Sequence, residues 1–193
     1  MNKITEAIRF AAEAHDKQKR KLSNHQYIFH ICEVGQIVSY MTSDVDTIVA
    51  ALLHDTVEDT EVTIEDIERN FGPRVRELVN GETENKREEL PPESTWKQRK
   101  EESLEELRNC TDIEEKKIWL ADKVSNIRSM FIYHLTHGRK TFENFHEKDP
   151  LQHKWYYTEI AKILKDDLGK ESVYKEYEML VDRLFGEYEW ETK

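Results

Sequence analysis

The sequence predicts a single all-α domain. Only 6 glycines and 4 prolines occur in 193 residues, which leaves few positions for the many turns of an all-β fold. Apolar residues recur at intervals of three and four along most of the chain, as on the buried face of an amphipathic helix. No internal repeat or shift in composition divides the chain. We therefore expect one helical bundle over residues 1–193.

In the first half, apolar periodicity predicts three longer helices, over residues 3–18, 27–41 and 45–53. Asp44 and Ser43 are suitable N-caps for the third of these helices. Thr63 and Asp66 form a capping-box pattern that opens a short helix, which ends at Gly72–Pro73. A second short helix is expected over residues 74–80, with Gly81 following its end.

In the second half, residues 82–94 are charged and aperiodic and contain Pro91–Pro92, so we expect a loop that is a candidate mobile flap. Asp112 is a suitable cap for a long helix, and Pro150 suits the first position of another. An irregular stretch is expected around residues 138–148. The helices expected in this half cover residues 95–109, 113–135, 150–168 and 171–185.

The charge balance limits the possible partners. Lys and Arg number 29 and Asp and Glu number 40, giving a formal net charge of −11, which argues against a general nucleic-acid or anionic-membrane binder. The two cysteines are too few for a disulfide scaffold. No apolar run is long enough to span a bilayer, and the N-terminus lacks the pattern of a signal peptide. We therefore expect a cytoplasmic protein.

One segment, AALLHDTVEDT over residues 50–60, concentrates titratable groups at the end of an apolar helix. If the helix continues, His54 pairs with Glu58 and Asp55 with Asp59 at i,i+4 spacing. Burying that much charge unpaired would be costly, and a divalent cation is a natural compensation. Taken alone, the same residues could also form an ordinary helix end, with a His-Asp dipeptide followed by a solvated acidic tail.

Two further segments favour the metal interpretation. His30 lies in an apolar-periodic helix upstream, where a histidine is by itself more often a core residue than a ligand. Asp122 lies in the apolar run IWLADKVSN, where a carboxylate needs a partner, and Asn126 follows it by one turn. Together with His54 and Asp55, these residues come from three separate helices, as ligands assembled inside a bundle do.

The pattern H…HD…D resembles that of the HD-domain metal-dependent phosphohydrolases. The segments AALLHDTVEDT and LADKVSNIRSM, with the upstream His15, Gln18, Arg20–Lys21 and Tyr27–Ile28, more closely resemble the RelA/SpoT-type (p)ppGpp hydrolases. The resemblance spans about residues 1–170, and the helix expected at 171–186 follows it. The chain is similar to the stand-alone small alarmone hydrolases, including those of metazoa.

This resemblance implies hydrolysis of the 3′-pyrophosphate of ppGpp or pppGpp, with one divalent metal, Mn²⁺ by preference, and a small nucleotide as the partner. It assigns His30, His54, Asp55 and Asp122 as metal ligands. Glu58 and Asp59 match the family's Glu-Asp pair, which handles the attacking water. The substrate-binding residues that it implies are Arg20 and Lys21 near the base, Asn126 near the sugar, and Lys97, Arg99 and Lys100 near phosphate.

The chain departs from the family in the loop Leu22–Gln26, which lacks the usual Gly and Pro, and at Ile31, where Pro is common. These changes concern nucleotide preference rather than the metal ligands. Two alternatives therefore remain at this stage. One is an HD phosphohydrolase acting on a nucleoside monophosphate or on the 2′-phosphate of NADPH. The other is a non-catalytic nucleotide sensor.

Overall fold

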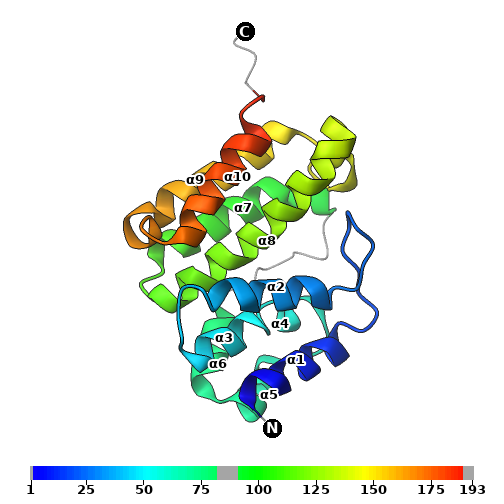
Figure 1. The fold of residues 1–193 in the computed structure, drawn as a ribbon. Coiled ribbons are helices and arrows are strands. Elements are labelled where there is room, and N and C mark those ends of the chain that lie inside the picture. Colours follow the sequence, from blue (N-terminus) through cyan, green and yellow to red (C-terminus); the bar gives the residue numbers. More distant parts are fainter. Residues whose placement is uncertain (1, 82–90, 189–193) are drawn as a thin grey trace.

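The computed structural model describes residues 2–81 and 91–188, and in these ranges its secondary structure consists of helices joined by loops, with one isolated β-bridge between Lys19 and Gln26 (Figure 1). The all-α prediction is confirmed. The helices of the N-terminal half are α1 (Lys3–Ala14), α2 (Ile28–Val38), α3 (Val45–Ala51), α4 (Thr56–Asp59), α5 (Ile64–Phe71) and α6 (Pro73–Asn80). Those of the C-terminal half are α7 (Pro92–Asn109), α8 (Ile113–His137), the 3₁₀ helix η1 (Gly138–Asn144), α9 (Pro150–Leu168) and α10 (Ser172–Phe185).

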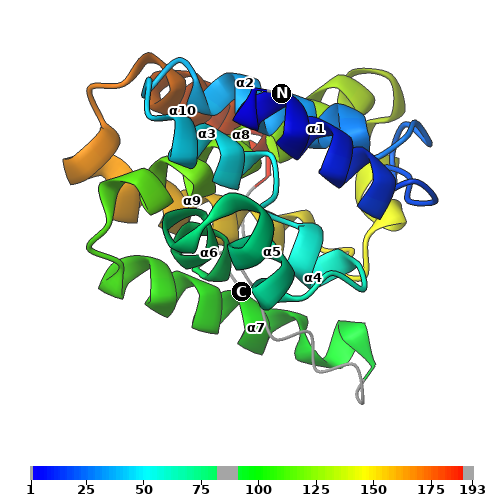
Figure 2. The same cartoon turned by 90° about the horizontal axis from the view of Figure 1, so that it is seen from below.

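Helix α8 is the central element of the bundle. Figure 1 shows it between α2 on one side and α9 and α10 on the other, and it packs against all three. Its 25 residues follow Asp112, whose side chain accepts a hydrogen bond from the backbone N–H of Glu114 and caps the helix. In Figure 2, α7 runs along the outside of the bundle, where it packs against α9.

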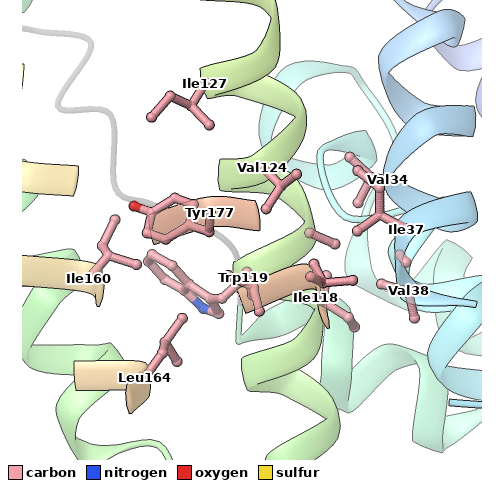
Figure 3. Packing of buried hydrophobic residues seen from close by; sticks show 14 of the residues in the cluster. Val34, Ile37, Val38, Ile118, Trp119, Val124, Ile127, Ile160, Leu164 and Tyr177 are labelled. Atoms are coloured by element: carbon pink, nitrogen blue, oxygen red, sulfur yellow. The ribbon is translucent and has the colours of Figure 1, made fainter. Parts of the chain in front are cut away.

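Apolar side chains leave α8 on opposite sides, so that it has a core on each flank (Figure 3). Ile118 lies on the side of α2, near Val34, Ile37 and Val38. Trp119 lies on the other side, and its neighbours there are Ile160, Leu164 and Tyr177. All of these residues are buried. A helix enclosed in this way places any polar residue on its inner turns in a largely dry environment.

Most predicted helices occur within a few residues of their expected limits, and the differences have local causes. The first helix ends at Ala14 rather than near residue 18, because His15 caps it and Gln18 turns toward α4. Helix α7 begins at Pro92, inside the loop expected over residues 82–94; residues 82–90 of that loop lie outside the described residues. The stretch expected to be irregular contains η1.

The predicted third helix also ends early, at Ala51 instead of residue 53, and turns follow before α4 begins at Thr56. This break matters for the acidic pair, because Glu58 and Asp59 stand on their own short helix rather than on a continuation of α3. In the described ranges 2–81 and 91–188, no helix has the length and apolarity required to cross a membrane.

The α2–α3 contact depends on a glycine. A Cβ placed on Gly35 would come within 2.6 Å of Leu52 Cδ2 and 2.8 Å of its Cγ. Leu52 is itself buried in the turn that precedes His54, so it has little room to move. We expect Gly35→Ala to destabilise the protein, since overpacking costs about 1–3 kcal/mol against a gain of about 1 kcal/mol in helix propensity.

Thermal unfolding measures this effect, with Gln36→Ala as the matched control because Gln36 is the exposed neighbour on the same helix. Gly35→Ala should lower Tm by a few degrees, and Gln36→Ala should leave it unchanged or slightly higher. A Tm for Gly35→Ala at or above that of the wild type would show that the α2–α3 contact has spare room.

Candidate metal centre and adjoining pocket

Two imidazoles and two carboxylates converge where α2, α8 and the turn after α3 meet. His30 Nε2 lies 3.2 Å from Asp122 Oδ1 and 3.5 Å from Asp55 Oδ2. His54 Nε2 lies 3.0 Å from Asp55 Oδ2 and 3.7 Å from Asp122 Oδ1. Ligands about 2.1 Å from one cation stand about 3.0–3.4 Å apart in octahedral or tetrahedral geometry. The observed spacings are close to that range.

The donor atoms of His30, His54 and Asp122 all lie within 4.8 Å of one another, and all three residues are buried. Asp55 is more exposed and approaches the two imidazoles from the edge of this group. Its Oδ2 also accepts a 2.6 Å hydrogen bond from the Tyr27 hydroxyl. The four residues, called the ligand cluster below, have the donor types of a mixed nitrogen–oxygen transition-metal site.

Hydrogen bonds fix which nitrogen of each imidazole faces the cluster. His54 Nδ1 lies 2.9 Å from the Ala51 carbonyl oxygen, which can only accept, so Nδ1 carries the hydrogen. His30 Nδ1 lies 2.8 Å from the Ser125 hydroxyl. His54 Nε2 is buried and makes no hydrogen bond of good geometry. A buried ring nitrogen without a hydrogen-bond partner is unusual, and coordination of a cation would satisfy it.

Electrostatics within the cluster are strongly coupled. Burial lowers the pKa of His54, but the adjacent Asp55 and Asp122 outweigh burial and raise that pKa well above its usual value. Burial raises the pKa of both carboxyls, yet His54 beside Asp55 and Lys123 beside Asp122 hold these pKa values well below the usual range. Positive charge is thus strongly favoured at this point of the interior.

The carboxylate oxygens of the cluster also have partners outside the cluster. Asn126 donates a 2.6 Å hydrogen bond to Asp122 Oδ1, and Lys123 forms an ion pair with Asp122 Oδ2. Burial raises the pKa of Tyr27, and Asp55 and Asp59 raise it further, so its hydroxyl stays protonated and donates to Asp55. Tyr27 and Lys123 therefore orient the two carboxylates.

A large cavity adjoins the cluster. Its volume is about 690 Å³, and it is bounded by the loop after α1 and by parts of α4, α7, α8 and α9. Among the described residues that line it, the basic side chains are Lys19, Arg20, Lys21, Arg99, Lys100 and Lys123, and the acidic ones are Glu58 and Asp59. An acidic protein therefore contains a pocket with a local excess of positive charge, which suits an anionic ligand.

Glu58 stands at the junction of this pocket with the ligand cluster. A smaller cavity of about 120 Å³ is lined by His54, Asp55 and Asp122, and Glu58, Lys100, Lys123 and Tyr156 line both cavities. Asp59 lines the large cavity but not the smaller one, and it accepts a 2.7 Å hydrogen bond from Gln18. Gln18 in turn lies 2.6 Å from Nδ1 of the buried His15.

Five of the six substrate-binding residues that the resemblance implies line the large cavity: Arg20, Lys21, Arg99, Lys100 and Asn126. Arg20 donates to Asn126 Oδ1 at 2.9 Å, and its guanidinium lies 5.6 Å from the centre of the Tyr27 ring. Lys97 is placed differently, because its ammonium lies over the Trp155 ring, 3.0 Å from the ring centre, and it is not a lining residue. Lys100, one turn further along α7, lines the cavity instead.

A sequence model of the HD domain matches residues 7–142, which include the whole ligand cluster. The chain belongs to the HD-domain family. Over 165 residues it is 38% identical to the guanosine-3′,5′-bis(diphosphate) 3′-pyrophosphohydrolase MESH1 of Xenopus tropicalis, covering 84% of each protein. It is 33% identical to the enzyme of the same name from Aquifex aeolicus over 178 residues, which are 91% of this chain and 25% of that longer protein.

The fold comparison agrees with the sequence comparison. A solved structure described as a metazoan ortholog of SpoT that hydrolyzes ppGpp matches this HD-domain chain with a TM-score of 0.73. The two are 28% identical, and the match covers 96% of this chain and 95% of the other. The resemblance to the RelA/SpoT-type hydrolases that the sequence predicts is therefore confirmed.

Several residues that contact the cluster were not assigned a role from the sequence. Tyr27 and Lys123 orient the carboxylates, and Ser125 contacts His30. Lys123 and Ser125 lie inside the LADKVSNIRSM segment, and their closeness to Asp122 in the sequence could have indicated that they contact the cluster. Tyr27 is part of the family resemblance, but its contact with Asp55, 28 positions away along the chain, depends on tertiary packing.

The ligand cluster predicts how metal binding responds to loss of one imidazole. We expect His54→Ala to weaken Mn²⁺ binding by more than the roughly 10–100-fold that loss of an outer hydrogen-bond partner typically costs, because it removes a donor atom. Isothermal titration of the metal-free protein measures the change. His137→Ala is the control, since His137 is exposed at the far end of α8. Equal affinity in the two variants would exclude His54 as a ligand.

Proposed function

We propose that this chain is a metal-dependent hydrolase that removes the 3′-pyrophosphate of ppGpp or pppGpp, giving GDP or GTP and pyrophosphate. One observation carries the proposal: a nucleotide-sized basic cavity opens onto a buried cluster of two imidazoles and two carboxylates, with Glu58 where the two meet. The named activities of MESH1 and of the Aquifex aeolicus enzyme, to which the chain is similar, support the same substrate.

The proposed cofactor is one divalent cation, Mn²⁺ by preference, held by His30, His54, Asp55 and Asp122. Mixed imidazole and carboxylate donors suit Mn²⁺ better than they suit Ca²⁺ or Mg²⁺, whose sites are typically formed by oxygen atoms alone. When bound, such a cation lowers the pKa of water and stabilises negative charge on a phosphate oxygen. The Nδ1–H of His54, held by the Ala51 carbonyl, and a buried Nε2 that has no hydrogen-bond partner support this arrangement.

In this proposal Glu58 handles the attacking water. A carboxylate at the boundary between the ligand cluster and the cavity can accept a proton from a water that approaches phosphorus. The bond between that phosphorus and O3′ breaks, and O3′ receives a proton as it leaves. Asp59, which accepts a hydrogen bond from Gln18, lines the cavity beside Glu58 and can pass to O3′ the proton that Glu58 has accepted from the water.

The other lining residues would hold the nucleotide. We assign Arg20 and Lys21 to the base, where the planar guanidinium can stack, and Asn126 to the sugar. Arg99 and Lys100 are the cations proposed for the phosphates, together with Lys123, which also touches Asp122. Lys97 keeps this assignment only if it leaves the Trp155 ring when substrate binds. The cytoplasmic location expected from the sequence stays a prediction.

Product analysis tests the substrate directly. We expect Mn²⁺-dependent release of pyrophosphate from ppGpp by the full chain, with NADPH and nucleoside monophosphates as comparison substrates. Release of orthophosphate from one of these, with ppGpp untouched, would retain the metal centre and replace the substrate. No turnover of any of them would instead favour a nucleotide sensor.

Glu58→Ala separates chemistry from metal binding. Because Glu58 is proposed to move a proton and is not a ligand, the variant should bind Mn²⁺ as the wild type does and lose about 10²–10⁴-fold in kcat. Turnover and Mn²⁺ affinity are measured on the same preparation. Glu61→Ala, at an exposed position just after α4, is the matched control. Near-normal kcat in Glu58→Ala would remove Glu58 from the mechanism.

A further inference from the structure

A series of hydrogen bonds leads away from the ligand cluster through residues that line neither of the two cavities. His30 Nδ1 lies 2.8 Å from Ser125 Oγ, and Ser125 Oγ donates to Glu33 Oε2 at 2.6 Å. A hydroxyl has one hydrogen, and here the carboxylate takes it. Ser125 must therefore accept from His30, which places the imidazole hydrogen on Nδ1 and leaves Nε2 bare toward Asp122.

The series of hydrogen bonds continues from Glu33 on α2 through α8 to α10. Arg128 Nη1 donates to the second oxygen of Glu33, Oε1, at 3.0 Å. The same guanidinium donates from Nε and Nη2 to the two carboxylate oxygens of Glu176, at 2.7 and 2.8 Å. This two-point contact fixes the plane of the guanidinium, and through it the orientation of Glu33. Glu176 lies on α10, beyond residues 7–142 that match the family.

We propose that Ser125, Glu33, Arg128 and Glu176 form a positioning relay that sets the metal affinity of the site through His30. The proposal rests on the metal role given to the ligand cluster under the proposed function. None of the four residues touches the metal or the substrate in this scheme. Their effect is to keep Nε2 of His30 bare and aimed at the cluster.

The physical reason is a choice between two hydrogen-bond directions. With Glu33 in place, the serine hydrogen is committed, and Ser125 can only accept from the imidazole. Without Glu33, that hydrogen can turn to Nδ1 of His30, which favours the tautomer with its hydrogen on Nε2. That hydrogen would point at Asp122 and compete with a cation. Arg128 and Glu176 keep Glu33 in the orientation that prevents this.

Depth within the fold orders the four residues by expected effect. Ser125 and His30 are buried, whereas about a third of each side chain of Glu33, Arg128 and Glu176 is exposed. Solvent weakens the outer ion pairs, so changes at Ser125 should affect metal affinity more than changes at Glu176. A purely structural role, in which Arg128–Glu176 only fastens α10 to α8, predicts a loss of thermal stability with no change in metal affinity.

The experiment measures Mn²⁺ affinity of the full-length metal-free protein without nucleotide, from the electron paramagnetic resonance signal of free Mn²⁺. Ser125→Ala should raise Kd by about 10–100-fold. Glu176→Gln should raise it by about 3–10-fold, since the outer pair is partly screened. Glu178→Gln is the matched control, because Glu178 lies on the same helix and contacts Tyr174 instead. It should leave Kd unchanged.

The double variant Ser125→Ala/Glu176→Gln decides whether the residues act in series. Once Ser125 is gone, Glu176 has no route to His30, so the double variant should bind Mn²⁺ no more weakly than Ser125→Ala alone. Fold-changes that multiply would overturn the relay, as would wild-type Kd values accompanied only by a lower Tm.

If the wild type binds no Mn²⁺, the metal role itself fails. If it binds Mn²⁺ but leaves ppGpp intact, only the substrate proposal fails.

Discussion

The structure depends on one electrostatic constraint, the presence of two carboxylates and two imidazoles in the interior of a helical bundle. Removing an ionised group from water costs on the order of several kcal/mol unless partners replace the lost hydration. Here the partners are supplied from every side: Tyr27 holds Asp55, and Lys123 and Asn126 hold Asp122. These contacts orient the two carboxylates, and the spacing between their oxygens and the imidazole nitrogens suits a shared cation.

Helix α8 supplies most of these partners, which explains its central place. Within a few turns it carries five residues that join the site to its surroundings: Asp122, Lys123, Ser125, Asn126 and Arg128. Lys123 and Asn126 contact Asp122 on α8 itself, whereas Ser125 and Arg128 reach Glu33 on α2. The apolar residues between them pack against α2 on one side and against α9 and α10 on the other (Figure 3). The same helix therefore holds the core together and connects the cavity, the ligand cluster and the C-terminal helix.

Much of this could be predicted from sequence because the determining signals are local. Helical periodicity located the helices, and the family resemblance of AALLHDTVEDT and LADKVSNIRSM, with His30 upstream, indicated the residues that meet in the ligand cluster. What could not be predicted depends on packing. Lys97 and Lys100 are equally basic, and only the position of Trp155 on α9 decides which of them lines the cavity. The break between α3 and α4 and the link from Tyr27 to Asp55 are likewise products of tertiary contact.

The loop between α1 and α2 is held at both ends by hydrogen bonds to the acidic residues of the site. Gln18 is tied to Asp59 and Tyr27 to Asp55, and backbone bonds from Tyr27 to Gln18 and from Arg20 to His25 close the loop between them. Asn24 adopts the left-handed conformation that its tight turn requires. Substitutions at the tip of the loop can therefore occur while Gln18 and Tyr27 keep Asp59 and Asp55 in position. In an evolving lineage, such a loop would let the choice of nucleotide drift independently of the hydrolytic machinery.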